Sequence, residues 1–266
     1  MARFAVSLQR MIPFLGYHHI LMVVQVAVII LLSILLAGCS SYSTMTSIYI
    51  MGVSYTNSTP SSLSPVTRNL SEILNQVKGP AQLEVRIGYF GMCVRQRGIL
   101  WLCSSDAEGL TQQIGPENDP LNLIGAAAKF KSDVLFSGLL FMSVVLAFIC
   151  ILLLATFPGW HEERDQQTGS MVDVKPFPSR PISMVAMSQA FVSALILLVS
   201  SLWQHIGAVG AAAMAESANY GNVKSAIGAG ATSLAWTAFT LETIVAIALL
   251  FQIVDIIMLN RNLDTD

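Results

Sequence analysis

Four long apolar runs constrain this chain more than any other feature of its sequence. They cover residues 20–37, 134–157, 182–203 and 231–253, and only the last contains a charged residue, Glu242. Each run is close to the roughly 20 apolar residues that a helix needs to cross the hydrocarbon core of a bilayer. Only 11% of the residues are charged, whereas an ordinary soluble domain has about 25%. The sequence therefore predicts an all-α membrane protein with four transmembrane helices.

The basic residues of the short loops predict the orientation of these helices. If the N-terminus is cytoplasmic, the cytoplasmic segments contain Arg3, Arg10, Arg164, Lys175, Arg180 and Arg261, and the short external loop contains only Lys224. This asymmetry follows the positive-inside rule, so both termini are predicted to be cytoplasmic. The resulting segments are a cytoplasmic arm (1–19), helix one (20–37), a long extracellular loop (38–133), helix two (134–157), a cytoplasmic loop (158–181), helix three (182–203), a second extracellular loop (204–230), helix four (231–253) and a cytoplasmic tail (254–266).

The long extracellular loop has local patterns of its own. Residues Ile48–Tyr55 are rich in β-branched and aromatic side chains, and Leu83–Ile87 alternates apolar and polar residues, so both predict strands. Residues Cys93–Cys103 predict a hairpin that turns at Arg97-Gly98. A short helix is expected over Leu121–Phe130, with Asp119 as its cap and Pro120 as its first residue. The loop is therefore expected to form a small extracellular β-sheet.

Two tripeptides in this loop match the acceptor pattern for N-glycosylation. They are Asn57-Ser58-Thr59, in a Ser- and Pro-rich stretch over residues 56–65 that we expect to be flexible, and Asn69-Leu70-Ser71. No other segment contains such a tripeptide. Because the charge rule also places this loop outside the cell, we expect a glycoprotein of the secretory pathway.

The four cysteines fall into two groups. Cys39 and Cys150 lie in or beside the apolar runs, whereas Cys93 and Cys103 lie in the extracellular loop. The secretory route is oxidising, and opposite positions on a hairpin bring two cysteines within bonding distance. The sequence therefore predicts a Cys93–Cys103 disulfide.

The residues around the first of these cysteines resemble a known pattern. Gly88-Tyr89-Phe90-Gly91-Met92-Cys93, followed by Cys103, is similar to the signature of the fungal factor-induced-gene family. That family consists of claudin-like tetraspan proteins linked to low-affinity calcium influx and to membrane fusion during mating. The resemblance extends to the four-span topology and to Gly38-Cys39-Ser40-Ser41 after helix one. Tyr89-Phe90 replaces the Gly-Leu-Trp of claudins, which favours the fungal branch.

The resemblance implies a claudin-like four-helix transmembrane bundle in the plasma membrane. It implies that Gly88, Tyr89, Phe90 and Gly91 are family motif positions that build the extracellular sheet. It also implies calcium as a related ion, and a calcium-channel partner or a homo-oligomer besides the membrane lipid. On physical grounds, glycine in a strand marks a bulge or a close backbone approach, and the two aromatic residues are expected to pack on the external ends of the helices.

Glu242 is the second candidate functional residue, because a charge near the bilayer midplane is costly and usually faces the bundle interior. It shares one helical stripe with Ala231, Ala235, Ala238 and Ala246, and a stripe on helix three consists of Ser183, Ala186, Ala190, Ser193 and Ser200. Small residues let helices approach closely. Glu242 is therefore expected to face another helix, with a serine or Gln189 as its hydrogen-bond donor. Two roles remain open: a packing contact and part of an ion pathway.

Several functional classes have no support in the sequence. There is no metal-spaced His/Cys set, no nucleophile elbow and no phosphate loop, so we expect neither an enzyme, nor a metal site, nor a cofactor. The net charge of −2 provides no basic field for nucleic acid. The long loop shows no dense set of calcium ligands; its clustered carboxylates are Asp106, Glu108, Glu117 and Asp119. The alternative to a calcium-influx role is a claudin-like structural organiser or adhesion protein that transports no ions.

Overall fold

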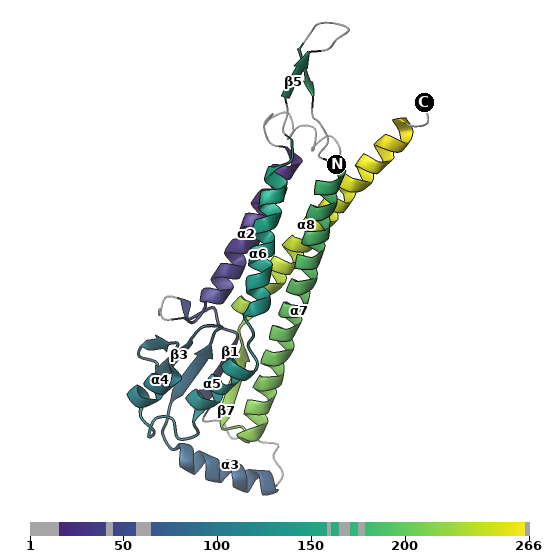
Figure 1. The fold of residues 1–266 in the computed structure, drawn as a ribbon. Helices are drawn as coiled ribbons and strands as arrows, with labels where there is room; N and C mark the ends of the chain where they lie inside the picture. The colour runs from purple at the N-terminus through teal and green to yellow at the C-terminus, as the bar shows by residue number, and fades with distance from the viewer. Residues whose placement is uncertain are drawn as a thin grey trace. The chain divides into compact units, whose positions relative to one another are not determined.

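The computed structural model describes residues 16–40, 45–56, 65–158, 161–164, 171–174 and 179–263. Four of its helices are long and apolar enough to cross a membrane: α2 (Tyr17–Ala37), α6 (Gly138–Ala155), α7 (Arg180–Ala218) and α8 (Ala229–Leu263) (Figure 1). With a small antiparallel sheet, they confirm the predicted class of a four-helix membrane bundle with a β-sheet. The chain divides into two compact units.

The first unit contains residues up to 30, residues 141–197 and residues from 238 onward. Its core combines side chains from all four helices: Leu21, Cys150, Leu154, Ala186, Ala190, Val245, Ala246 and Leu249. The two stripes of small residues predicted on α7 and α8 are buried, each side chain being 8% exposed or less. Close helix packing through small residues is the usual arrangement in membranes. In the connector between α6 and α7, strands β5 (His161–Arg164) and β6 (Met171–Val174) pair antiparallel.

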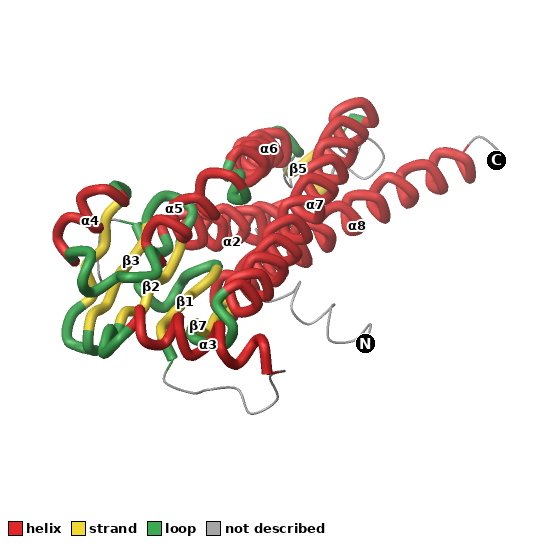
Figure 2. The backbone as a smooth tube through the Cα atoms, turned by 90° about the horizontal axis from the view of Figure 1, so that it is seen from below, coloured by secondary structure: helices red, strands yellow, loops and turns green. Residues whose placement is uncertain are grey.

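The second unit contains residues 31–140 and 198–237 and is built on a five-stranded sheet. Its strands are β1 (Met51–Tyr55), β2 (Leu83–Ile87), β3 (Met92–Gln96), β4 (Trp101–Ser104) and β7 (Val223–Ile227). They lie in the order β4-β3-β2-β1-β7, every neighbouring pair being antiparallel (Figure 2). The predicted hairpin forms, with Arg97 and Gly98 at its turn in left-handed conformations (φ 49° and 72°).

One face of this sheet is apolar and carries two helices. In β2 the apolar Leu83, Val85 and Ile87 are buried, whereas the alternate residues Glu84 and Arg86 are half-buried on the other face. Helices α4 (Ala107–Ile114) and α5 (Leu123–Asp133) lie beside the strands (Figure 2). Their inward side chains are Leu110, Ile114, Leu123, Ile124, Ala127 and Phe130. This alternation is the period-2 pattern of a sheet with one covered face.

The start of α5 differs from the prediction. We expected Pro120 as the first helical residue, but the helix begins at Leu123 and its N-cap residue is Asn122. Asp119 still caps the helix, because its carboxylate accepts hydrogen bonds from the backbone N–H groups of Leu123 and Ile124 at 2.7 and 2.9 Å. Asp106 likewise caps α4. Helix capping therefore occupies two of the four clustered carboxylates.

Two segments between the predicted membrane helices form regular structure that the sequence patterns did not indicate. The sequence after Trp203 remains helical to Ala218, because its many alanines favour helix, and Val223–Ile227 adds β7 to the edge of the sheet beside β1. Pro65–Lys78 forms helix α3, with Pro65 at the first helical position, where its missing N–H costs nothing. Residues 204–230, predicted as the second extracellular loop, thus contain the last part of α7 and strand β7.

Candidate functional site

The two motif glycines lie where backbone segments approach each other closely. A Cβ added at Gly88 would lie 2.1 Å from the carbonyl oxygen of Gly38, and one at Gly91 would lie 2.6 Å from the carbonyl oxygen of Cys39. The Gly88 N–H donates to the Gly91 carbonyl oxygen at 2.9 Å, which closes the turn between β2 and β3. The glycines thus serve the close approach that the sequence suggested, and they place this turn against the segment that follows α2.

The two aromatic motif residues behave differently from each other. Tyr89 is buried, and its hydroxyl donates to the side-chain oxygen of Gln204, in α7, at 3.1 Å. Burial raises the pKa of the Tyr89 hydroxyl, so it stays a neutral donor. Phe90 is 40% exposed, and its carbonyl oxygen accepts from the Lys131 ammonium at 3.2 Å. Tyr89 thus contacts helix α7, whereas Phe90 is partly exposed.

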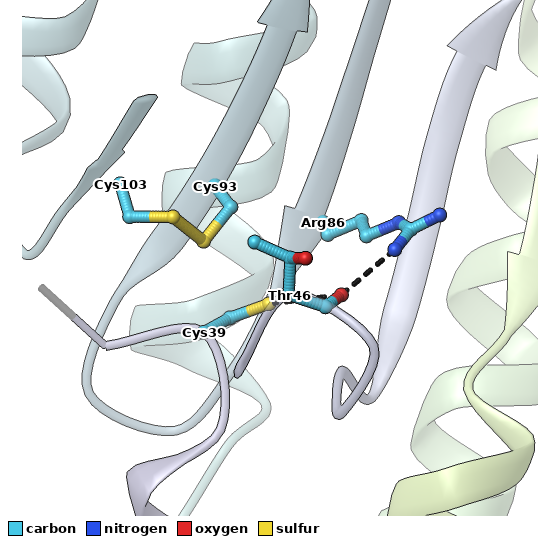
Figure 3. The surroundings of a disulfide bond; sticks show 5 residues. All are labelled: Cys39, Thr46, Arg86, Cys93 and Cys103. Atoms are coloured by element: carbon cyan, nitrogen blue, oxygen red, sulfur yellow. Dashed lines mark hydrogen bonds between the residues drawn. A yellow bond between two sulfur atoms is a disulfide. The ribbon is translucent and has the colours of Figure 1, made fainter. Parts of the chain in front are cut away.

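Cys93 and Cys103 are directly opposite each other on β3 and β4 and form a disulfide, with an S–S distance of 2.02 Å (Figure 3). Figure 3 also shows Cys39, whose thiol approaches the Thr46 carbonyl oxygen at 3.8 Å. Cys39 is fully buried, and this burial raises the pKa of its thiol to about 12. Cys39 is thus an unreactive packing residue in the folded protein.

Arg86 links the sheet to the segment before β1. Its guanidinium donates to the Thr46 carbonyl oxygen at 2.8 Å (Figure 3) and lies 4.7 Å from the centroid of the Tyr49 ring and 4.4 Å from that of Trp101. Glu84 completes the group, because its carboxylate accepts from Arg86 at 2.9 Å and pairs with Arg95. Sequence reasoning missed Arg86, although a basic residue in the middle of an alternating strand was a visible signal.

The two glycosylation positions have different outcomes. Asn57 lies outside the described residues. Asn69 lies on α3 at an exposed position. A glycan on Asn69 therefore stays a prediction, one that the exposure of this residue permits.

Glu242 lies where all four membrane helices meet. It is fully buried, and the polar side chains of Gln25 on α2 and Ser193 on α7 lie beside its carboxyl. Cys150 on α6 lies beside both Glu242 and Gln25. We call Gln25, Cys150, Ser193 and Glu242 the bundle cluster. All four are at most 1% exposed, so it is a closed polar site in the apolar core.

The polar atoms of this cluster are poorly satisfied within the described residues. No hydrogen bond of ordinary geometry reaches either carboxylate oxygen of Glu242, either amide atom of Gln25 or the Ser193 hydroxyl. Gln189, which we expected as a donor, instead donates to the Leu146 carbonyl oxygen on α6. A buried polar group without a partner costs roughly 1–3 kcal/mol, so hydrogen bonds among Glu242, Gln25 and Ser193, which lie side by side, would stabilise the packing of their helices.

The oxygen atoms in the cluster limit what it can bind. Glu242 provides two oxygens, and Gln25 and Ser193 provide one each. A bound Ca²⁺ ion takes about 6–8 oxygen ligands, usually with several carboxylates. The described part of the chain also contains no group of three or more His, Cys, Asp or Glu side chains spaced to hold a metal ion. The cluster is chemically suited to hydrogen bonding between helices.

Comparison with known proteins agrees with the fold and the motif. A family model described as "Ca2+ regulator and membrane fusion protein Fig1" matches residues 70–255. The match covers more than two thirds of the chain and includes strands β2, β3, β4 and β7 and helices α6 and α7. No curated protein matches the chain. With its four membrane helices, its disulfide-bonded sheet and this match, the chain belongs to the Fig1 family of Ca²⁺ regulator and membrane fusion proteins.

Proposed function

We propose that this protein regulates low-affinity calcium influx at the plasma membrane and supports membrane fusion during fungal mating or polarised growth. The observation that carries the proposal is the family match over residues 70–255. We propose no enzymatic activity, and the partners we propose are membrane lipid and either a calcium channel or further copies of this chain.

The bundle cluster favours regulation of a partner over conduction of calcium by this chain. Glu242 is the only charged residue within the four apolar windows, and it is fully buried. One carboxylate with two neutral neighbours offers too few oxygens for a dehydrated Ca²⁺ ion. A polar group shared by four helices instead couples their packing. In this proposal, Glu242 stabilises the arrangement of the helices, and a partner carries the ion.

The extracellular unit is suited to hold such a partner because it is locally rigid. The disulfide joins β3 to β4, Arg86 fixes the segment before β1, and Tyr89 anchors the motif turn to α7. A rigid scaffold keeps an interaction surface in place without further loss of entropy on binding.

Two calcium measurements test the proposal together. The purified protein is reconstituted in liposomes loaded with a calcium indicator, and calcium uptake is measured in cells that lack or express the gene. We expect no flux in liposomes and uptake that depends on the gene in cells. Flux in liposomes would show that the chain conducts calcium itself. Uptake that does not depend on the gene would leave the structural-organiser function.

Cysteine labelling tests the orientation on which this proposal depends. Single cysteines introduced at positions 62 and 220 should react with an impermeant reagent on intact cells, and one at position 168 should react only after permeabilisation. Labelling at position 168 from outside would overturn the orientation with both termini in the cytoplasm.

A further inference from the structure

The sheet of the extracellular unit has two different ends. At one end, the Gly88–Gly91 turn packs against Gly38 and Cys39, directly after the membrane helix α2. At the other end is the turn of the β3–β4 hairpin, where the Arg97 N–H donates to the Gln82 carbonyl oxygen at 3.0 Å. Five-residue strands separate the two ends by about 17 Å. The hairpin turn is therefore at the end of the sheet opposite to the end that packs against the segment after α2.

Helix α3 lies at this same far end. Its last residue, Lys78, donates to the Thr56 carbonyl oxygen at 2.6 Å, and Thr56 follows the last residue of β1. The antiparallel register places the end of β1, the start of β2 and the end of β3 together. Figure 1 shows α3 beyond the strands β1 and β7 of this unit.

Helix α3 is amphipathic, and three of its apolar side chains are exposed, whereas Leu74 is half-buried. Two of its polar side chains form hydrogen bonds with the rest of the unit: Ser71 donates to the Tyr220 carbonyl oxygen at 3.0 Å, and Lys78 binds as described above. Leu70, Ile73 and Val77 are 40%, 55% and 54% exposed. Their spacing of three and four residues places them on one stripe of the helix. A folded unit normally turns such a stripe inward, so this stripe is available to something outside the unit.

The hairpin turn exposes a second apolar group. Ile99 is 83% exposed and Leu100 is 74% exposed, and they precede Trp101 on the edge strand β4. Beside the turn is a depression of about 230 Å³ whose lining includes Glu84, Arg95 and Arg97. Arg95 pairs with Glu84. Arg97 is exposed.

We propose that this far end docks on a phospholipid bilayer other than the one that the four helices span. We name the docking residues Leu70, Ile73, Val77, Ile99 and Leu100 the distal surface. The inference deepens the proposed role in membrane fusion and rests on it, because fusion requires that two bilayers be brought together. The apolar side chains enter the boundary between headgroups and acyl chains, and Arg97 binds the lipid phosphates.

The chemistry of the distal surface favours lipid over a second copy of the chain. An amphipathic helix with an exposed apolar stripe is a common way to bind a membrane surface, and arginine is favoured at lipid headgroups because its apolar stem can lie in the membrane boundary while its charge stays in water. The acidic Glu72 lies away from the stripe formed by Leu70, Ile73 and Val77. Five partly exposed side chains on two separate elements offer less than the roughly 800 Å² per partner of a stable protein interface.

Flotation of the full-length protein tests the proposal. The protein is placed in neutral nanodiscs and mixed, without calcium, with protein-free liposomes of phosphatidylcholine alone or with phosphatidylglycerol. Two variants alter the distal surface: Ile99→Ser with Leu100→Ser, and Ile73→Ser with Val77→Ser. Met45→Ser is the matched control, because Met45 is 37% exposed but lies near the other end of the unit, where its carbonyl oxygen accepts from the Cys39 N–H. Each protein also carries Asn69→Gln, so that no glycan beside Leu70 interferes.

We expect the parent protein, with its unaltered distal surface, and the Met45→Ser control to float with the liposomes. Both should float more strongly with liposomes that contain the anionic lipid. Each distal variant should float at least about tenfold less, because each loses two large apolar contacts with the bilayer. Arg97→Gln should remove the preference for the anionic lipid. Melting curves equal to that of the parent protein show that the substitutions act on the surface and not on folding.

Three results would overturn the inference. The distal variants could float as well as the parent protein, or the parent protein could fail to float. Association only between two protein-containing nanodiscs would assign the surface to a second copy of the chain. Calcium uptake in cells separates this inference from the proposed function. If the distal variants float as well as the parent protein and calcium uptake still depends on the gene, only the docking surface is contradicted. Uptake that does not depend on the gene contradicts the calcium role, whatever the flotation shows.

Discussion

Replacing Gly88 with alanine tests the close backbone approach between the turn that joins β2 to β3 and the segment that follows α2. The added Cβ would lie 2.1 Å from the carbonyl oxygen of Gly38 and 3.0 Å from the Cβ of Cys39. Ordinary contact begins near 3.4 Å, so the first distance is too short by 1.3 Å. The clashing oxygen belongs to the backbone and cannot rotate away. The turn or the segment after α2 must therefore move.

The size of the effect follows from the cost of overpacking, which is typically about 1–3 kcal/mol. Because the contact is with backbone, we place Gly88→Ala at about 3 kcal/mol of lost stability. For a protein of this size, that corresponds to a melting temperature lower by about 6–12 °C. Gly91→Ala, whose Cβ would lie 2.6 Å from the carbonyl oxygen of Cys39, should cost less. Gly210→Ala on α7 meets no atom within 4 Å and should stabilise by up to about 1 kcal/mol through helix propensity.

The assay is thermal unfolding of the purified protein in detergent, followed with a dye that becomes fluorescent on reaction with thiols. Both free cysteines, Cys39 and Cys150, are buried in the folded protein, so the dye reports unfolding. The expected order of melting temperatures is Gly88→Ala below Gly91→Ala, below wild type, with Gly210→Ala at or above wild type. A Gly88→Ala protein as stable as wild type would refute the argument from close approach.

Three further predictions concern the cysteines and the bundle cluster. Cys93→Ser and Cys103→Ser should each lose about 3 kcal/mol of stability and most surface expression, because they open a short covalent loop. The double variant should be no worse than either single one, since only one bond is broken; a mass map with both thiols free would contradict this. Cys39 should not react with a maleimide at pH 8 in the folded protein, because burial raises the pKa of its thiol to about 12. It should react after denaturation. Rapid labelling of Cys39 in the native protein would contradict this prediction. Glu242→Gln should match wild type in calcium uptake at equal surface expression, whereas Glu242→Ala should lower the melting temperature. Reduced uptake by the Gln variant would instead support an ion pathway.

Local patterns were enough to predict the elements whose formation depends on nearby residues. The four membrane helices follow from continuous apolar composition, which determines transfer into lipid residue by residue. The β2 strand follows from the alternation in Leu83–Ile87, and the β3–β4 hairpin from the turn at Arg97-Gly98. The Cys93–Cys103 disulfide joins residues only ten positions apart, so hairpin geometry alone brings them together.

The tertiary structure decided the contacts between residues that are far apart in sequence. Gln25 was visible as a polar residue in an apolar run, but only the rotation of α2 against α8 places it beside Glu242. The hydrogen bond from Tyr89 to Gln204 spans 115 residues. Strand β7 exists as a strand because the edge of β1 is available to pair with it. Hydrophobic periodicity determines which face of an element is buried, but not which partner covers it, because that choice depends on helix rotation and strand register in the assembled fold.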